Sequence, residues 1–244
     1  LEKIIVGMEP TSIYWEALAT YCKNNGMILV HVNPAAVHKS KELDDNDPSK
    51  NDRKDPKVIA DLVTDGRYSF PYMPEEEYAQ LRELSNLKIR TQESLTQCKN
   101  RLARWYSRYF PEFKEAYKNV VSKTAMIIMD MYPLPEDIVT LGVEGILQIW
   151  RNKKVRAAGE SRAKKLYEAA KNSIGRKEAA AVARLEFQSI KEDLDRYQGR
   201  LEAIDKEVDE ILPKIKNADN LFEIKGVGKA TVLTFLSEVG EISR

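Results

Sequence analysis

The sequence predicts a mixed architecture, α/β plus all-α, in which a small α/β segment precedes long helices and a short helical C-terminal element. Three observations support this prediction. Two short apolar runs with β-branched residues flank a helical stretch near the N-terminus. Two long series of apolar residues recur at alternating spacings of three and four. Charged residues make up 32% of the chain, above the usual quarter or so, a composition that favours long helices.

Residues 1–70 predict a β–α–β unit. "KIIVGMEP" is typical of a short strand, and "MILVHVNP" of a second strand buried on both faces of a parallel sheet. Between them, Tyr14, Leu18 and Tyr21 have the spacing of one helical face. A polar loop, "KSKELDDNDPSKND", then leads to a helix that begins near residues 55–56, where a proline suits the first helical position.

The rest of the chain is predicted to be helical. One apolar series covers residues 81–109, with a polar interruption at Lys88 and Thr91. A second series covers residues 180–211 and ends before Pro213, which describes a coiled-coil seam. At 1.5 Å per residue, a helix of this length is roughly 50 Å long.

A seam of that length exceeds what a small α/β domain covers, so the long helices are expected to pack against each other or against a second copy. A homodimer or higher oligomer through these helices is one hypothesis. Residues 112–175 predict shorter helices, interrupted by "YPLPED" and by glycines. We expect three domains, at residues 1–72, 73–216 and 217–244.

Charge is balanced overall but not locally. The chain has 39 Lys and Arg against 38 Asp and Glu. Residues 82–123 hold ten basic and four acidic side chains, residues 151–184 eleven and three, and residues 186–211 four and nine. Basic stretches of this kind suit phosphate binding, although a solvated helix face has the same composition. The chain has no apolar run long enough to cross a membrane and only two cysteines, so a reduced cytoplasmic protein is expected.

Three carboxylates have positions that suit metal chemistry. Glu9 follows the first strand, where open α/β sheets place their sites. Asp52 and Asp55 are three residues apart at a helix start, so both can point toward one cation. Carboxylate oxygens suit Mg²⁺ (or Mn²⁺), and such ions assist cleavage of phosphodiesters. Considered alone, Glu9 is explained equally well by the start of a helix, and Asp52 and Asp55 are explained better by helix capping than by a metal site.

The order of these motifs resembles the DEDD-type insertion-sequence transposases. The resemblance is carried by "EPTSIYW", then "GMILVHVNP", then "KNDRKDPKVIADL". Ser12 stands where the family usually has glycine, and Pro56 where it has alanine. The resemblance implies an RNase H-like (RuvC-like) domain in which Glu9, Asp52 and Asp55 are three of four metal-binding acids. It further implies that the fourth, an aspartate, lies upstream of this chain, so that the sheet here is partial.

The C-terminal stretch "LFEIKGVGKATVLTFLSEVGEIS" resembles the start of the same family's second catalytic domain and is typical of a helix-hairpin-helix-like element. Glycines in GVG allow close approach of a phosphate to the following helix. The resemblance implies a nucleophilic serine downstream of residue 244, so neither Ser237 nor Ser243 is assigned that role and this fragment is expected to be inactive. It also implies a guide RNA that pairs with target and donor DNA.

Basic side chains near the acidic residues and along the helices are predicted to contact the sugar-phosphate backbone without reading sequence. The candidates, with the two glycines, are Lys50, Arg53, Lys54, Arg101, Arg104, Arg108, Lys153, Lys154, Lys225, Gly226, Gly228 and Lys229.

The resemblance therefore implies a metal-dependent DNA recombinase that is guided by RNA. Two alternatives stay open. One is a metal-dependent nuclease or junction resolvase with the same acids and no serine step. The other is a non-catalytic scaffold that binds nucleic acid and dimerises, in which the acids are only helix caps.

Overall fold

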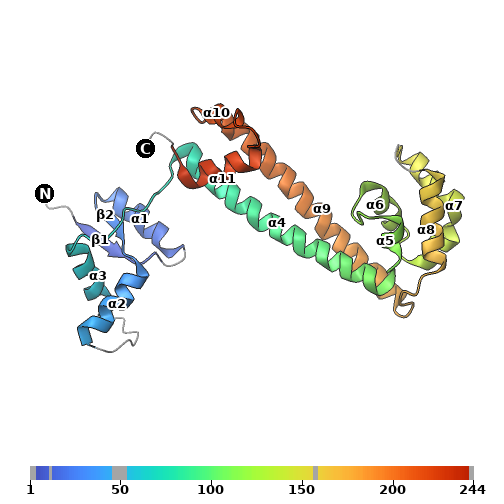
Figure 1. The fold of residues 1–244 in the computed structure, drawn as a ribbon, viewed down its shortest axis with the longest axis horizontal. Coiled ribbons are helices and arrows are strands. Elements are labelled where there is room, and N and C mark those ends of the chain that lie inside the picture. Colours follow the sequence, from blue (N-terminus) through green and yellow to red (C-terminus); the bar gives the residue numbers. More distant parts are fainter. Residues whose placement is uncertain (1–3, 11–12, 46–53, 156–158, 242–244) are drawn as a thin grey trace. The chain divides into compact units, whose positions relative to one another are not determined.

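The computed structural model describes residues 4–10, 13–45, 54–155 and 159–241, and the chain forms two compact units, Leu1–Pro74 and Glu75–Arg244 (Figure 1). The first unit contains a parallel two-stranded sheet, and the described part of the second is helical. The mixed α/β and helical class predicted from the sequence is therefore confirmed. The finer division into three domains stays a prediction.

The first unit is a β–α–β arrangement followed by two helices. The strands are parallel, and Ile5 pairs with Ile28. Val32, on the chain leaving the second strand, is buried with side chains of both later helices. The elements are β1 (Ile5–Met8), α1 (Tyr14–Asn24), β2 (Ile28–His31), α2 (Pro34–Asp45) and α3 (Lys54–Thr64).

Part of the predicted polar loop is helical. The helix α2 continues through Asp45, whereas the sequence predicted a loop from Lys39. Its start is stabilised by Asn33, whose side-chain oxygen accepts a hydrogen bond from the Ala35 N–H at 2.8 Å. The lysines, glutamate and leucine that follow are good helix formers, so the helix extends until that composition ends. Residues 46–53 lie outside the described part of the chain.

The helix α1 is present, but it buries a different face from the predicted one. Tyr14 and Tyr21 are 78% and 59% exposed. The buried side chains are Ala19 and Cys22, which pack in one cluster with Leu29 of β2. Small side chains let a helix lie close to a sheet, so in this helix size decides the buried face more than apolar spacing does.

The second unit consists of two long helices, a group of shorter helices between them in sequence, and a C-terminal helical element (Figure 1). None of the helices in the described part of the chain has the length and apolar character needed to cross a membrane. The elements are α4 (Glu76–Tyr109), α5 (Phe113–Ala116), α6 (Lys123–Met129), α7 (Pro135–Asn152), α8 (Glu160–Lys171), α9 (Ala180–Ile211), η1 (Leu212–Lys214), α10 (Ala218–Phe222) and α11 (Lys229–Val239).

The helices α4 and α9 pack along their lengths within one chain (Figure 1). The buried Trp105 donates its indole N–H to the Ala183 carbonyl at 2.9 Å. Lys88 interrupts the apolar series of α4, and its ammonium group forms an ion pair with Asp205 of α9 at 2.5 Å. The predicted seam is thus covered by α4 of the same chain, and dimerisation stays a prediction.

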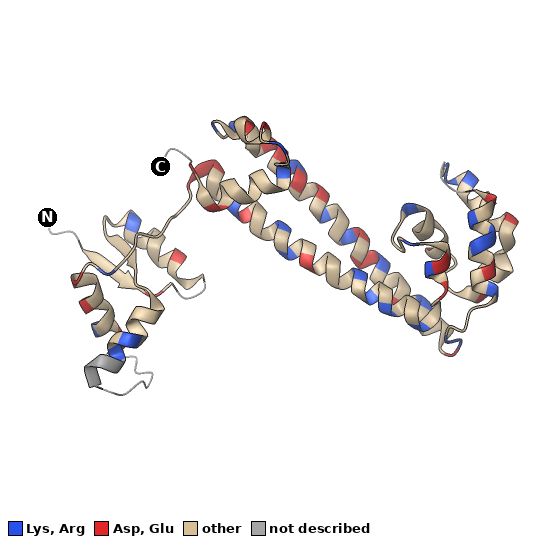
Figure 2. Ribbon diagram, viewed as in Figure 1, with Lys and Arg blue, Asp and Glu red and all other residues tan. Residues whose placement is uncertain are grey.

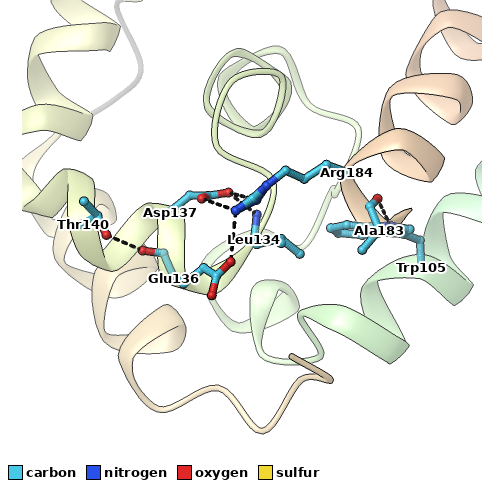
Figure 3. Close-up of polar contacts among 7 residues, drawn as sticks. All are labelled: Trp105, Leu134, Glu136, Asp137, Thr140, Ala183 and Arg184. Carbon is cyan, nitrogen blue, oxygen red and sulfur yellow. Dashed lines mark hydrogen bonds and ion pairs between the residues drawn. The ribbon is translucent and has the colours of Figure 1, made fainter. Parts of the chain in front are cut away.

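An ion-pair network joins α9 to the start of α7. Arg184 places its guanidinium 2.8 Å and 2.9 Å from the two carboxylate oxygens of Asp137 and 3.0 Å from Glu136 (Figure 3). Asp137 also accepts the Leu134 N–H at 3.0 Å and so caps the helix. Because the guanidinium binds one carboxylate in two places, it fixes the orientation of α7 as well as its position.

The connection from α8 to α9 is fastened to the end of α4. The Glu112 carboxylate accepts hydrogen bonds from the Ser173 hydroxyl and the Ile174 N–H. A side chain at Gly175 would place its Cβ 2.1 Å from the Tyr109 carbonyl oxygen, so only glycine fits there. Burial raises the pKa of Glu112, but the hydrogen bonds from Ile174 and Ser173 lower it more, and the net pKa lies below the ordinary 4.5.

We predict that Glu112 makes the stability of the second unit depend on pH. A carboxyl whose pKa is lowered by folding stabilises the fold above its unfolded pKa, and this contribution is lost as pH falls through the folded pKa. Glu112→Gln should therefore lower the melting temperature near pH 7, and the difference from wild type should shrink below pH 4.5 or so. Thermal melting followed by circular dichroism measures this, with Glu168→Gln on the exposed face of α8 as the control. A difference that stays constant from pH 7 to pH 3 would contradict the prediction.

Candidate functional site

Glu9 directly follows β1 and lies on the side of the sheet that faces α3. Side chains alternate along a strand, so Glu9 shares a face with Gly7, while Met8 points the other way. A Cβ placed on Gly7 would lie 2.5 Å from a methyl group of Val63 and 3.0 Å from one of Ile59, both on α3. The missing side chain at Gly7 therefore lets α3 pack directly on the strand that carries Glu9.

Asp55 lies in the first turn of α3 and forms an ion pair with Lys41 of α2. The side chains of Lys41 and Asp55 are 11% and 32% exposed, so solvent screens the pair only in part. The N-terminal turn of a helix also favours a negative charge. Two cationic features, one from α2 and one from the helix itself, thus hold the Asp55 carboxylate in place.

Glu9 and Asp55 line the same cleft, which has a volume of about 930 Å³. Apolar side chains of β1 and α3, among them Ile5, Ile59 and Val63, form most of its other walls. The structure thus brings two of the three predicted carboxylates together at the carboxyl end of a parallel strand, where α/β proteins place their sites.

Asp52, Lys50 and Arg53 lie outside the described residues, and Lys54 is described in its backbone only. In the part of the chain that the structure describes, no three His, Cys, Asp or Glu side chains form a group that could hold a metal ion. The donor type of Glu9 and Asp55 fits a hard divalent cation, since Mg²⁺ prefers carboxylate oxygen and water. Two carboxylates supply only part of such a shell.

A half-buried histidine on the opposite face of the sheet takes no part in this cleft. His31 pairs with Met8 in the strand register and packs edge-on against Trp15, with ring centroids 4.5 Å apart. Burial lowers the pKa of His31. Since Met8 and Glu9 point to opposite sides, His31 belongs to the packing between the sheet and α1.

The predicted basic face of α4 is only partly available. Arg101 pairs with Asp193 of α9 at 2.8 Å. Arg108 lies over the ring of Tyr109, with 5.3 Å from its guanidinium carbon to the ring centroid. Arg104 is exposed. The surface that remains for a nucleic acid on this helix therefore centres on Arg104 and the outer edge of Arg108.

Two other predicted basic regions lie farther along the second unit. Lys153 and Lys154, at the end of α7, are exposed, and Figure 2 shows further basic positions along α8. At the C-terminal turn, Gly226 has φ of +90°, a conformation that favours glycine. Lys225 is exposed, whereas Lys229 pairs with Asp209 of α9 at 2.6 Å and donates to the Asp205 carbonyl.

Gly228 precedes α11 and acts as its N-cap residue. The order of α10, a glycine turn and α11 agrees with the helical hairpin expected from the sequence. Of the two lysines beside the turn, only Lys225 faces solvent, because Lys229 is held by α9. The lysine at position 229 therefore contributes to packing of the hairpin onto the long helices.

A parallel sheet with carboxylates at its edge, joined in one chain to a long basic helix, α4, is an arrangement suited to an enzyme that acts on nucleic acid. Residues 1–111 match a family model described as a transposase, that of the DEDD transposases of the IS110 type. This match agrees, over these residues, with the family resemblance seen in the sequence, and it suggests a transposase or recombinase function. No curated protein matches the chain.

Sequence reasoning missed two residues, Gly7, which lines the cleft, and Lys41, which pairs with Asp55. Gly7 stands inside an apolar strand, where a glycine indicates close approach of another element, so this signal was present. Lys41 lies in the stretch predicted as a loop and is one lysine among several. Its pairing with Asp55 depends on α2, whose extent was not predicted.

We predict that a methyl group at Gly7 pushes α3 away from β1. Overpacking of this kind costs about 1–3 kcal/mol, so Gly7→Ala should speed amide hydrogen exchange along α3. Exchange followed by mass spectrometry measures the effect. The control is Gly199→Ala on α9, where nothing lies within 4 Å of the added Cβ. Unchanged exchange of the α3 amides in Gly7→Ala would show that α3 does not depend on this contact.

Proposed function

We propose that the chain supplies the metal-binding part of a DNA strand-exchange site with an RNase H-like fold. Glu9, Asp52 and Asp55 would hold Mg²⁺ or Mn²⁺ against the scissile phosphate. The observation that carries this proposal is the shared cleft of Glu9 and Asp55 within the segment that matches the transposase family. The parallel strands and the helix between them agree with such a fold, and Asp52 is included on its position in the family pattern.

The chemistry assigned to the chain is binding and orientation. When bound, a divalent ion supplies Lewis acidity at the phosphate. Asp55 is positioned by Lys41 and by the α3 terminus, and Glu9 by the strand it follows.

The nucleophile in this proposal is a serine downstream of the C-terminal element. Ser237 does not suit that role, because it is 1% exposed and donates its hydroxyl proton to the Thr234 carbonyl at 2.9 Å. As in the sequence analysis, Ser237 and Ser243 are not assigned as the nucleophile. Ser243 lies outside the described residues.

Nucleic acid would bind along the basic surfaces of the second unit. Arg104, Arg108, Lys153, Lys154 and Lys225 are exposed and suit contacts to phosphates. The guide RNA of the family would provide sequence recognition by base pairing, and the protein would hold the backbone. A homodimer, if formed, would use surfaces other than the α4–α9 seam, since that seam is filled within the chain.

We predict that Glu9→Gln and Asp55→Asn each lower the affinity for Mn²⁺ and abolish strand exchange. Each change removes a charged oxygen donor and keeps nearly the same shape. Metal binding is measured by electron paramagnetic resonance of free Mn²⁺, and exchange by joining of labelled donor and target DNA in the transposase that contains this chain. The control is Asp61→Asn, which removes an exposed carboxylate from the same helix. Normal metal affinity and normal exchange in both variants would reject the assignment.

A covalent intermediate separates the proposed mechanism from a nuclease that uses the same acids. A serine step leaves a protein–DNA adduct, whereas direct hydrolysis by activated water leaves none. Trapping on labelled DNA followed by denaturing electrophoresis tests this. Cleavage without an adduct would favour the nuclease or resolvase.

A further inference from the structure

A basic hollow lies in the second unit among α5, the chain that follows it, α6 and α8. Its volume is about 600 Å³, within the range of ligand sites. Three cationic side chains and three hydroxyl groups line it: Lys118, Arg162, Lys165, Ser122, Thr124 and Ser161. Lys118 and Lys165 are exposed, and Ser122 and Thr124 are half-buried. This combination of cations and hydroxyl donors suits an anion with several oxygen atoms.

The guanidinium of Arg162 is held at the hollow by an aromatic ring. Its central carbon lies 5.8 Å from the ring centroid of Tyr117, which is only 4% exposed. Burial raises the pKa of Tyr117 to about 12, and the charge of Arg162 opposes that increase. The neutral ring therefore acts as a platform for the cation, so less conformational freedom is lost when a ligand binds.

The hollow keeps a net positive charge despite the acidic residues near it. Glu160, in the first turn of α8, pairs with Lys164 one turn farther along, at 2.6 Å. Among the described residues that line the hollow, one, Glu115, is acidic and three are cationic. The helix α8 also begins here, at Gly159, without a side-chain cap, and the partial positive charge of its N-terminus adds to that of the side chains.

The surrounding charge favours a polyanion over a small anion. Residues 151–184 hold eleven basic and three acidic side chains, and the exposed Lys153 and Lys154 precede α8. A single small anion would contact only the cations of the hollow. A nucleic-acid backbone presents a phosphate at every nucleotide and can also contact the cations around it. The aromatic ring at the hollow is covered by Arg162 and does not offer a face for base stacking.

We propose that this hollow binds a phosphate group of a nucleic-acid backbone, with Lys118, Arg162 and Lys165 as its cationic contacts and the three hydroxyl groups as further donors. This inference rests on the proposed function for the identity of the partner as nucleic acid. The contact positions the polymer on the second unit and reads no sequence, because none of these groups selects among bases.

The test compares two double variants that remove the same charge. Lys118→Gln/Lys165→Gln alters the hollow, and Lys99→Gln/Lys216→Gln alters two exposed lysines elsewhere in the second unit. Binding to a labelled DNA duplex, a DNA single strand and an RNA hairpin is measured by fluorescence anisotropy over a range of salt concentrations. Thermal melting of each variant checks that the fold is kept.

We expect the hollow variant to bind at least one of the three probes about tenfold more weakly than the control variant does. The slope of log affinity against log salt should also fall by about 0.7–0.9, which corresponds to one lost phosphate contact. The probe with the larger loss identifies the polymer as DNA or RNA. If the wild-type protein binds a probe and the two double variants have equal affinities and slopes, the assignment of the hollow as a phosphate site is wrong, while the proposed nucleic-acid partner is unaffected. Failure of the wild-type protein to bind any probe would overturn the proposed nucleic-acid partner and the hollow together.

Discussion

The lengthwise packing of α4 against α9 is the contact on which the second unit depends. These helices are far apart in sequence, and side-chain contacts fasten three other parts of the unit to them or to the residues just beyond them. Arg184 of α9 holds the start of α7, Glu112 beyond α4 holds the return from α8, and Lys229 ties α11 to α9. Apolar burial supplies the main driving force, and the ion pairs fix register and orientation. The basic hollow therefore sits on a group of helices whose place is set by this pair.

Much of this arrangement could be predicted from residue spacing. The series at residues 180–211 became a single helix whose buried side chains include Ala183, Phe187 and Ile190, as the spacing indicated. Pro111 and Pro213 lie just after the ends of α4 and α9, because proline cannot continue a helix. The same spacing could not identify the partner of the seam. Whether α9 packs on α4 or on a second copy depends on how the helices between them direct the chain. Contacts such as that of Glu112 with Ile174 bring α9 back beside α4.

In the first unit, the sequence predicted the elements better than their contacts. Strand composition and the proline near residue 56 located β1, β2 and α3. The buried face of α1 was predicted wrongly. The small side chains of Ala19 and Cys22 are buried in place of the larger tyrosines, because they let the helix lie close to the sheet. The carboxylates were predicted as metal ligands from the family resemblance, because composition alone does not separate a metal ligand from a helix cap, and that role stays a prediction. Lys41 was missed because an ion pair between two helices leaves no periodic trace in the sequence.

The ion pair between Lys41 and Asp55 has a consequence for how the first unit folds. A carboxylate in a partly enclosed cleft usually needs a counter-charge, and in many metalloproteins only the ion supplies it, so that the apoprotein unfolds. Here the chain carries its own ammonium group for Asp55. Assembly of this unit can therefore precede any encounter with a divalent cation, and the β–α–β framework is expected to stay folded in the presence of a chelator.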